Sequence, residues 1–373
     1  MGLHIVKREG CPLWKKVLFY LAAIAAALTL GGVILRVIGV NPFAYYTKMF
    51  TINFFNDYYP HNVVTNYLNN FVPLALTSLG LSLAFKMRFW NIGGEGQFIV
   101  GAVAASAVAL QLGDTLPSAV TLILMCLAAM AAAGLFGLLV AALKVKFGTN
   151  ETLLTLMLNY IALFGLKYLL NTKASWNFFL RPESPRPKPQ KLPVGAMFPL
   201  FPIVENYTLN LCVILVFVIA VLLYIYLKHS KQGYEISVVG DSPGSARYAG
   251  MKVNRIVLRT VFLSACLIGL ASAFKMGTAG SLSEAITNDV GWTGIIVAWL
   301  AQLNTWAILL VSALITLLHN GSVAANAAFK QVDANFADML QGIILFLVLA
   351  ADFMIRFKIV RTRKEDKHGR KHG

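Results

Sequence analysis

The chain has 373 residues, of which 58% are hydrophobic and only 13% are charged. Soluble globular proteins carry about 25% charged residues, so this composition excludes a soluble domain and indicates a fold whose solvent is lipid. In a soluble protein the formal net charge of +16 would suggest nucleic-acid binding, but here the Lys and Arg residues fall between apolar runs. We therefore expect the lipid bilayer, and no nucleic acid, as a partner.

The first apolar run, 17–35, is long enough to span a bilayer, and we read it as a retained helix rather than a cleaved signal peptide. Uncharged runs of this kind predict about ten transmembrane helices. The predicted segments are 17–40, 70–86, 92–112, 117–143, 152–170, 208–228, 256–276, 290–303, 305–323 and 337–357. The split of 290–323 at Asn304 is open, because one long tilted helix would also fit this uncharged stretch.

Most of the 32 Lys and Arg residues cluster in segments that face one side if both termini are cytoplasmic. The chain then divides into a cytoplasmic N-terminal segment (1–16), a transmembrane domain (17–357) and a basic cytoplasmic tail (358–373). Within the transmembrane domain, 171–207 is a Pro-rich outer loop that cannot be helical, and it predicts either contact with an external partner or a solvated connector.

The tetrapeptide AFKM occurs at 84–87 and again at 273–276, at the inner end of one predicted helix and the outer end of another. Inverted repeats place equivalent segments in this way. The predicted fold class is therefore an all-α integral membrane protein with inverted repeats. It is expected to be a multi-pass protein.

The first stretch that could carry function is NIGGEGQ at 91–97, three glycines and a carboxylate at the start of an apolar run. Glycine at this density disfavours a regular helix, and irregular backbone at membrane depth is tolerated only where protein or water covers it. A charge at the bilayer centre costs about 2.5–3.5 kcal/mol on insertion scales, so Glu95 should lie near an interface or a polar cavity. Two readings stay open: a tight turn, or a broken helix beside a translocation path.

The cytoplasmic loop 229–255 contains the second stretch, GDSPGSARYAGM. Ser242 as N-cap, Pro243 at the first helical position and Gly250 beyond the end predict an isolated helix of about two turns. A helix this short is marginal alone, so it must dock on the membrane surface or on another protein. Its small residues, with Tyr248 as a single aromatic, favour insertion into a groove.

A third group of polar residues lies between Lys275 and Trp292 and predicts either a re-entrant outer segment or an ordinary outer loop. Polarity and position select candidate residues for a substrate pathway. These are Asn91, Glu95, Gln97, Asn159, Glu284, Asp289 and Trp292.

Several kinds of chemistry have no sequence support. The four cysteines stand far apart, no HExxH occurs, and no nucleophile and base share a recognised spacing, so we expect no metal site, no catalytic residues and no enzyme activity. No Lys is followed by Ser or Thr, which excludes the nucleotide-binding GxxxxGK[ST] motif. Any ATP must be hydrolysed on another chain.

Three elements of the sequence carry a resemblance to a known family. They are FWNIGGEGQFIVGA (89–102), GDSPGSARYAGM (240–251) and LQGIILFLVLAADF (340–353). They resemble the permeases of bacterial nucleoside or simple-sugar ABC importers, which are relatives of the ribose and branched-chain amino acid permeases. The resemblance covers roughly residues 60–357. It implies that the second element is the coupling helix that docks on the ATPase. The matching positions are Gly240, Ser242, Pro243, Ala246, Arg247, Tyr248, Ala249 and Gly250. Where the family usually has Asn-Pro-Glu-Ala, this chain has DSPGSA, which keeps the cap.

The resemblance implies an ABC importer permease in the bacterial cytoplasmic membrane that translocates a small polar solute, a nucleoside or alternatively a simple sugar. Its implied partners are an ATPase subunit that binds ATP and Mg²⁺, a second permease that forms a paralogous heterodimer, and an extracytoplasmic substrate-binding lipoprotein. We expect no cofactor on this chain. The rival class is an ion-coupled secondary transporter that works alone. Its coupling carboxylate would be Glu95, Glu284, Asp338 or Asp352.

Overall fold

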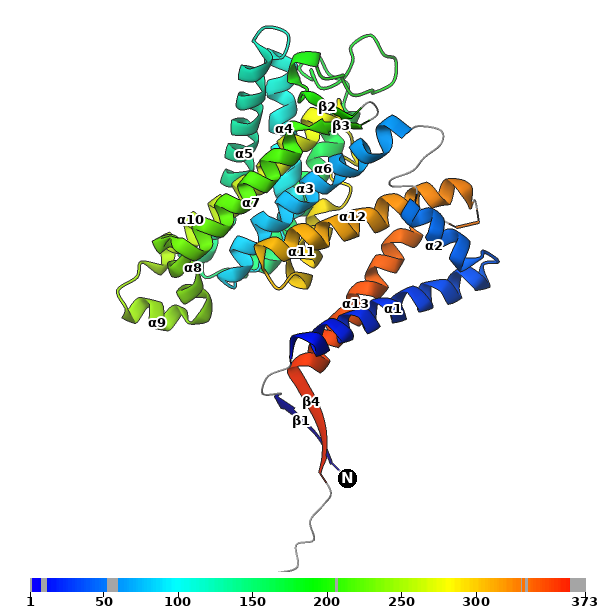
Figure 1. Cartoon of the computed structure of the whole chain (residues 1–373). Coiled ribbons are helices and arrows are strands. Elements are labelled where there is room, and N and C mark those ends of the chain that lie inside the picture. Colours follow the sequence, from blue (N-terminus) through cyan, green and yellow to red (C-terminus); the bar gives the residue numbers. More distant parts are fainter. Residues whose placement is uncertain are drawn as a thin grey trace, which may run out of the picture. The chain divides into compact units, whose positions relative to one another are not determined.

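The computed structural model describes residues 2–7, 12–51, 60–204, 207–329, 331–332 and 335–362 (Figure 1). These residues form two compact units, one of 1–50 with 321–373 and one of 51–320. Within the described part, nine helices are long and apolar enough to cross a membrane, which confirms a multi-pass helical fold. Cys11 and the tail beyond Thr362 lie outside the described residues.

The first unit consists mainly of helices from the two ends of the chain. Its elements are β1 (Gly2–Lys7), α1 (Leu13–Val37), α2 (Pro42–Thr51), the end of α12 (Thr305–Ala328), α13 (Phe336–Arg356) and β4 (Phe357–Thr362). Strands β1 and β4 pair antiparallel, and α1 packs along α13. The hydroxyls of Tyr45 and Ser322 lie 2.5 Å apart and tie α2 to α12.

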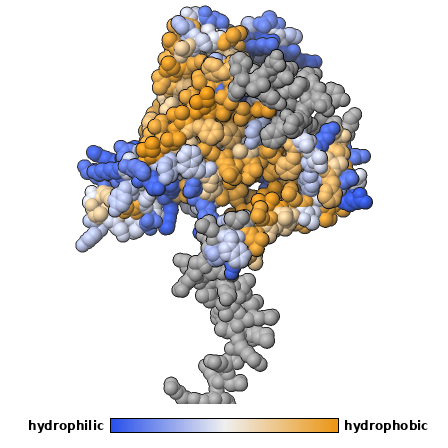
Figure 2. All heavy atoms as spheres, viewed as in Figure 1, coloured by the Kyte–Doolittle hydropathy of each residue, from blue (hydrophilic) through white to orange (hydrophobic). Residues whose placement is uncertain are grey.

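The second unit carries the middle of the chain. Its elements are α3 (Pro60–Lys86), α4 (Gly94–Leu112), α5 (Ser118–Phe147), α6 (Glu151–Asn171), the 3-10 turn η1 (Val194–Ala196), β2 (Leu200–Val204), β3 (Tyr207–Asn210), α7 (Leu211–His229), α8 (Lys231–Asp241), α9 (Pro243–Tyr248), α10 (Val253–Ala279), α11 (Val290–Leu300) and the first part of α12. Helix α10 is central, because it packs against α3, α4 and α5. On the face that Figure 2 shows, apolar side chains cover the walls of the long helices, while hydrophilic ones gather at the top of the view and over α8 and α9 at the lower left.

Small residues allow the central helices to approach closely. A Cβ on Gly269 of α10 would lie 2.3 Å from the carbonyl oxygen of Ala129 on α5, so the two backbones touch there. Small residues take this role in membranes because lipid tails are as apolar as the side chains, and association depends on close packing. The pair α5–α10 therefore forms the rigid centre of this unit.

Helices α3 and α10 run antiparallel, since Ser264 of α10 donates to the carbonyl of Gly80 (2.7 Å) while Lys275 reaches Asn70. Each helix carries AFKM near its C-terminal end, and a break and a second helix follow each one, α4 after α3 and α11 after α10. Both breaks use non-glycine residues with positive φ, Arg88 (57°) in the first and Asn288 (48°) in the second. An inverted repeat would show this antiparallel arrangement, and the repeat itself stays a prediction. We call α3 with α4, and α10 with α11, the two repeats.

The structure corrects several predicted boundaries. The stretch 290–323 forms two helices, but α11 has only 11 residues and is too short to span. Helix α3 begins ten residues before the predicted start, because its first part is rich in Asn and escaped a search for apolar runs. Helices α2 and α8, of 10 and 11 residues, were missed because they are too short to be found in a search for spans. Helix α8 leads directly into α9, so the prediction of an isolated α9 was wrong.

Candidate functional site

The N-termini of α4 and α11 meet beside α3, and the side chain of Glu95 joins them. Its carboxylate accepts a hydrogen bond from the backbone N–H of Gly291 (2.8 Å), and further bonds from the backbone of Trp292 and the hydroxyl of Thr287. Unpaired N–H groups at a helix N-terminus attract a carboxylate. Glu95 is 7% exposed, so it serves as the N-terminal cap of the second broken helix.

The contact leaves no room for a side chain at position 291. A Cβ on Gly291 would lie 2.3 Å from the backbone nitrogen of Glu95 and 2.6 Å from its carboxylate oxygen. Further along, the ring of Trp299 stacks on Trp90 with centroids 5.2 Å apart, which fixes the other end of α11 to the first break. These two contacts join α11 to the first break and to the start of α4. We call residues 87–97 and 287–292 the helix junction.

Helix α6 forms hydrogen bonds to the helix junction through a side-chain amide and a hydroxyl. Asn159 accepts from the N–H of Gly96 (2.8 Å) and donates to the carbonyl of Ile92 (2.9 Å), while Thr155 accepts from the N–H of Ile92 (3.3 Å). Backbone groups freed by the irregular segment are satisfied in this way, as burial requires. Thr155 was not among the predicted residues, although its spacing of four from Asn159 places both on one helical face.

Asn91 and Gln97 close the first break with a reciprocal pair of side-chain amide hydrogen bonds, each 3.1 Å. Both side chains are almost fully buried. The helix junction therefore brings together Asn91, Glu95, Gln97 and Asn159, with the backbone of Trp292. Their contacts give them a role in holding the broken helices, while contact with a substrate stays a prediction.

The other two candidate pathway residues lie differently. Glu284 is exposed and accepts from the side chain of Asn171 at the end of α6 (2.7 Å). Asp289 is exposed at the N-cap of α11, with φ of 56°, and its side chain makes no capping hydrogen bond. These contacts place Glu284 beside α6 and leave Asp289 at the edge of the helix junction.

The predicted capped helix is present as α9. Ser242 accepts from the N–H of Ser245 (3.2 Å), Pro243 occupies the first position, and Gly250 follows the helix with φ of 77°. Only Ala246 of α9 is buried, and Tyr248 is 97% exposed. The packing of this chain therefore does not explain the aromatic side chain.

Helix α8 connects α9 rigidly to the transmembrane helices. A Cβ on Gly240 would lie 2.1 Å from the carbonyl oxygen of Lys86, the last residue of α3, so the two backbones are in direct contact. Arg259 of α10 forms an ion pair with Glu235 of α8 (3.0 Å). A displacement of α9 would thus reach α3 at the residue before the first break, and also α10. We call α8 and α9 together the cytoplasmic helix pair, after the side of the membrane on which the sequence predicts them.

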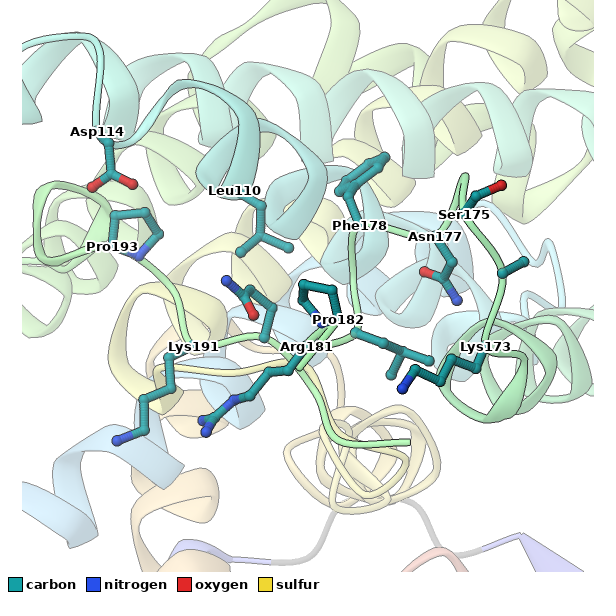
Figure 3. Close-up of a pocket in the computed structure, with 13 residues that line it drawn as sticks. Leu110, Asp114, Lys173, Ser175, Asn177, Phe178, Arg181, Pro182, Lys191 and Pro193 are labelled. Atoms are coloured by element: carbon teal, nitrogen blue, oxygen red, sulfur yellow. The ribbon is translucent and has the colours of Figure 1, made fainter. Parts of the chain in front are cut away.

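The Pro-rich loop has an ordered fold of its own. Among its described residues, those from 172 to 204 form no helix other than the 3-10 turn η1, and the bridges Leu180–Pro189 and Lys191–Ser281 hold the loop together. It surrounds a hollow of about 650 Å³, in which Figure 3 shows Arg181 and Lys191 extending in the same direction. The hollow is lined by Leu110, Asp114, Lys173, Ala174, Ser175, Asn177, Phe178, Leu180, Arg181, Pro182, Gln190, Lys191 and Pro193. This surface is predominantly basic.

The family model described as the permease component of the branched-chain amino acid transport system matches residues 63–349. The chain belongs to this permease family. The match includes the helix junction, the cytoplasmic helix pair and most of both repeats. The permease is therefore a multi-pass transport protein of the cytoplasmic membrane, and residues 1–62, which contain α1 and α2, lie outside the matched range.

Individual relatives align with this permease over nearly its whole length. The glucose ABC transporter permease protein of Haloferax volcanii is 28% identical, over 96% of this chain and 93% of the relative. The guanosine ABC transporter permease protein of Bacillus subtilis is 29% identical, over 92% and 96%. A nucleoside ABC transporter permease protein of Lactococcus lactis is 25% identical, over 94% of each chain. The permease therefore resembles subunits of both nucleoside and sugar ABC transporters.

Proposed function

We propose that this permease carries a nucleoside across the cytoplasmic membrane, and that ATP hydrolysis on a separate subunit drives the step. The observation that carries the proposal is the cytoplasmic helix pair. Its helix α9 is exposed and capped, and its helix α8 is in backbone contact with α3 beside the first break. A partner that moves α9 would move α3 and α10, and alternating access needs rigid repeats that gate about a central point. The helix junction is the point where the two repeats meet.

Three partners complete the proposed transporter. An ATPase that binds ATP and Mg²⁺ docks on α9, and a second, paralogous permease supplies the other half of the path. The third partner is an extracytoplasmic binding lipoprotein, which docks on the predicted outer side at the hollow in the Pro-rich loop. The basic side chains Lys173, Arg181 and Lys191 of that hollow would complement an acidic surface. The words ABC transporter in the names of the relatives support the ATPase partner.

The contacts of the carboxylates weigh against the rival of ion-coupled transport. Glu95 caps α11, and Glu284 is bonded to Asn171. Asp352 accepts from the hydroxyl of Tyr20 (3.1 Å) and pairs with Arg356 (2.8 Å). A coupling carboxylate must exchange its ion with water during each cycle, and these three groups are engaged in structural contacts instead. The fourth candidate, Asp338, is exposed in the first turn of α13.

The substrate class is tested by competition for uptake. In cells that depend on this importer, labelled guanosine uptake is expected to fall at least tenfold when unlabelled nucleosides are added in large excess. The same excess of glucose or fructose is expected to change it by less than twofold, because a site matched to buried hydrogen bonds rejects a solute that leaves them unpaired. Uptake of labelled sugar, with no uptake of nucleosides, would overturn the choice of substrate.

A further inference from the structure

A chain of hydrogen-bonded polar side chains links three helices of the second unit. The ammonium of Lys275 on α10 donates to the amide oxygen of Asn70 on α3 (2.8 Å), and the amide nitrogen of Asn70 donates to Asn320 on α12 (3.0 Å). Asn70 lies ten residues into α3, about 15 Å along its axis at 1.5 Å per residue. These groups therefore lie in helices and not in a loop, within a few residues of one end of each apolar span.

Lys275 is an unusual residue for this place. An ammonium has three donors, and within the described part of the chain its one hydrogen bond is to Asn70, with no carboxylate in ion-pair distance. Side chains on a helix lean toward its N-terminus, so Lys275 leans away from the near end of α10 at Ala279 rather than toward the surface there. An ionisable residue inside a membrane segment points to function.

Several buried hydroxyls are without partners. Among the described residues, no hydrogen-bond partner exists for the hydroxyls of Thr77 on α3 and of Ser312 and Thr316 on α12, all at most 3% exposed. The hydroxyls of Thr149 and of Thr260, which lies near the other end of α10 from Lys275, are also unpaired within this part of the chain. Other buried serines, such as Ser78 and Ser82 on α3, donate to carbonyls of their own helix. An unpaired buried polar group costs about 1–3 kcal/mol, so three of them on the same two helices need an explanation.

The polar groups on α12 share one face. Ser312, Thr316 and Asn320 follow each other at intervals of four residues, a spacing that keeps them in line along about 12 Å of helix. Leu309 and Ile315 flank them as buried apolar side chains, and the buried Ile308 ends the row at 308. The face of α12 that turns inward is therefore apolar at its sides and polar along its middle. We call Asn70, Thr77, Lys275, Ser312, Thr316 and Asn320 the polar strip.

We propose that the polar strip is the part of this subunit that binds the solute during translocation. The three hydroxyls and two amides can donate to and accept from a neutral ring compound rich in hydroxyl and carbonyl oxygens, and Lys275 donates to one acceptor oxygen of that compound. Bound solute supplies the hydrogen bonds that the hydroxyls lack. This inference rests on the proposed function and deepens it, because it names the residues that meet the nucleoside.

The alternative role is structural, since polar side chains also hold transmembrane helices together. The two roles differ in access to water. A path must be wet at some stage of the cycle, whereas side chains that only join helices stay dry. Reaction of an introduced thiol with a water-soluble thiosulfonate separates the roles, because the thiolate attacks the reagent's sulfur and displaces a sulfinate, and the thiolate forms only where water enters.

The experiment uses the complete importer in cells, with the four native cysteines replaced by alanine and a single cysteine introduced at Thr316. A methanethiosulfonate reagent with a fixed positive charge is added during guanosine uptake, with and without excess guanosine. Thr316→Cys is expected to react, and guanosine is expected to slow the reaction at least fivefold. The controls are Ser106→Cys, whose native hydroxyl bonds to Ala102 on its own helix, and the exposed Leu314→Cys on the opposite face of α12. Neither control should show protection by guanosine.

A second variant keeps the test decisive if Thr316→Cys does not fold. Lys275→Met is expected to lower the maximal rate of guanosine uptake about tenfold, because a charge-assisted hydrogen bond to the solute is lost. Lys275→Arg should restore part of it, and Lys188→Met in the exposed outer loop should have no effect. Unchanged uptake in Lys275→Met, or no reaction at position 316 in a transporting variant, overturns the inference. Absence of guanosine uptake in the parent importer contradicts the proposed function instead.

Discussion

Glu95→Leu is expected to reduce the amount of folded permease to less than a tenth, while Glu95→Gln retains most of it. Leucine leaves the N–H of Gly291 and its neighbours at the start of α11 buried without an acceptor, at about 1–3 kcal/mol for each group. Glutamine keeps one acceptor oxygen in the same place. The measurement is the yield of monodisperse protein after detergent extraction, together with its thermal unfolding midpoint.

The matched control for this prediction is Glu183→Leu, which removes an exposed carboxylate from the Pro-rich loop and should leave the yield unchanged. Wild-type yield and unfolding temperature in Glu95→Leu would contradict the capping role. The pair also separates two functions of the carboxylate. If Glu95 carried a coupling ion, Glu95→Gln would fold normally and still lose transport, whereas a cap predicts that transport follows the amount of folded protein.

Arg247→Glu is expected to lower substrate uptake at least tenfold with a wild-type amount of protein in the membrane. Arg247 is exposed on α9 beside Tyr248, so the substitution disturbs no packing within this chain. Reversing a charge at a docking surface places like charges together and costs several kcal/mol when the partner is complementary. Uptake is measured in cells, and membrane content by immunoblot.

Arg186→Glu provides the control for this second prediction, because it makes the same exchange at an exposed residue of the Pro-rich loop. Tyr248→Ala should reproduce the loss, since an aromatic side chain that a partner buries on binding is a frequent centre of binding energy. Normal uptake in both Arg247→Glu and Tyr248→Ala would show that α9 does not transmit the driving force.

Much of this architecture could be predicted from the sequence because lipid imposes simple rules. Spans of about 20 apolar residues are required, so most membrane helices were found within a few residues of their ends. The capped helix was also predictable, since Ser242, Pro243 and Gly250 each act on the local backbone. Local signals of this kind do not depend on what packs against them.

What the sequence could not provide was contact between distant segments. Glu95 and Gly291 stand 196 positions apart, and neither residue type indicates that one caps the helix that begins at the other. Polarity alone made Glu95 a pathway candidate, while the structure gives its carboxylate three donors from α11 and the segment before it. The hydroxyls of the polar strip were missed because serine and threonine inside apolar runs look like ordinary helix residues until their partners are known.

Helix α8 shows a third limit. Its sequence, KQGYEISVVGD, is not apolar enough for a span, and the cap at Ser230 that precedes it was not recognised, so it was read as part of a loop. Tertiary contacts stabilise it instead, since Ile236 and Val239 are buried and Glu235 pairs with Arg259. Most helical stability in proteins comes from such packing rather than from propensity.

The central claim is that an ATPase bound at the cytoplasmic helix pair drives this permease. The most direct test is a pull-down from native membranes in mild detergent that compares wild type with Arg247→Glu and measures the ATPase activity of the copurifying chains. The account predicts an ATPase with the wild type and its loss from the variant, with equal amounts of permease in both. A wild-type protein that transports substrate but recovers no ATPase would contradict it, and would favour a transporter that works alone.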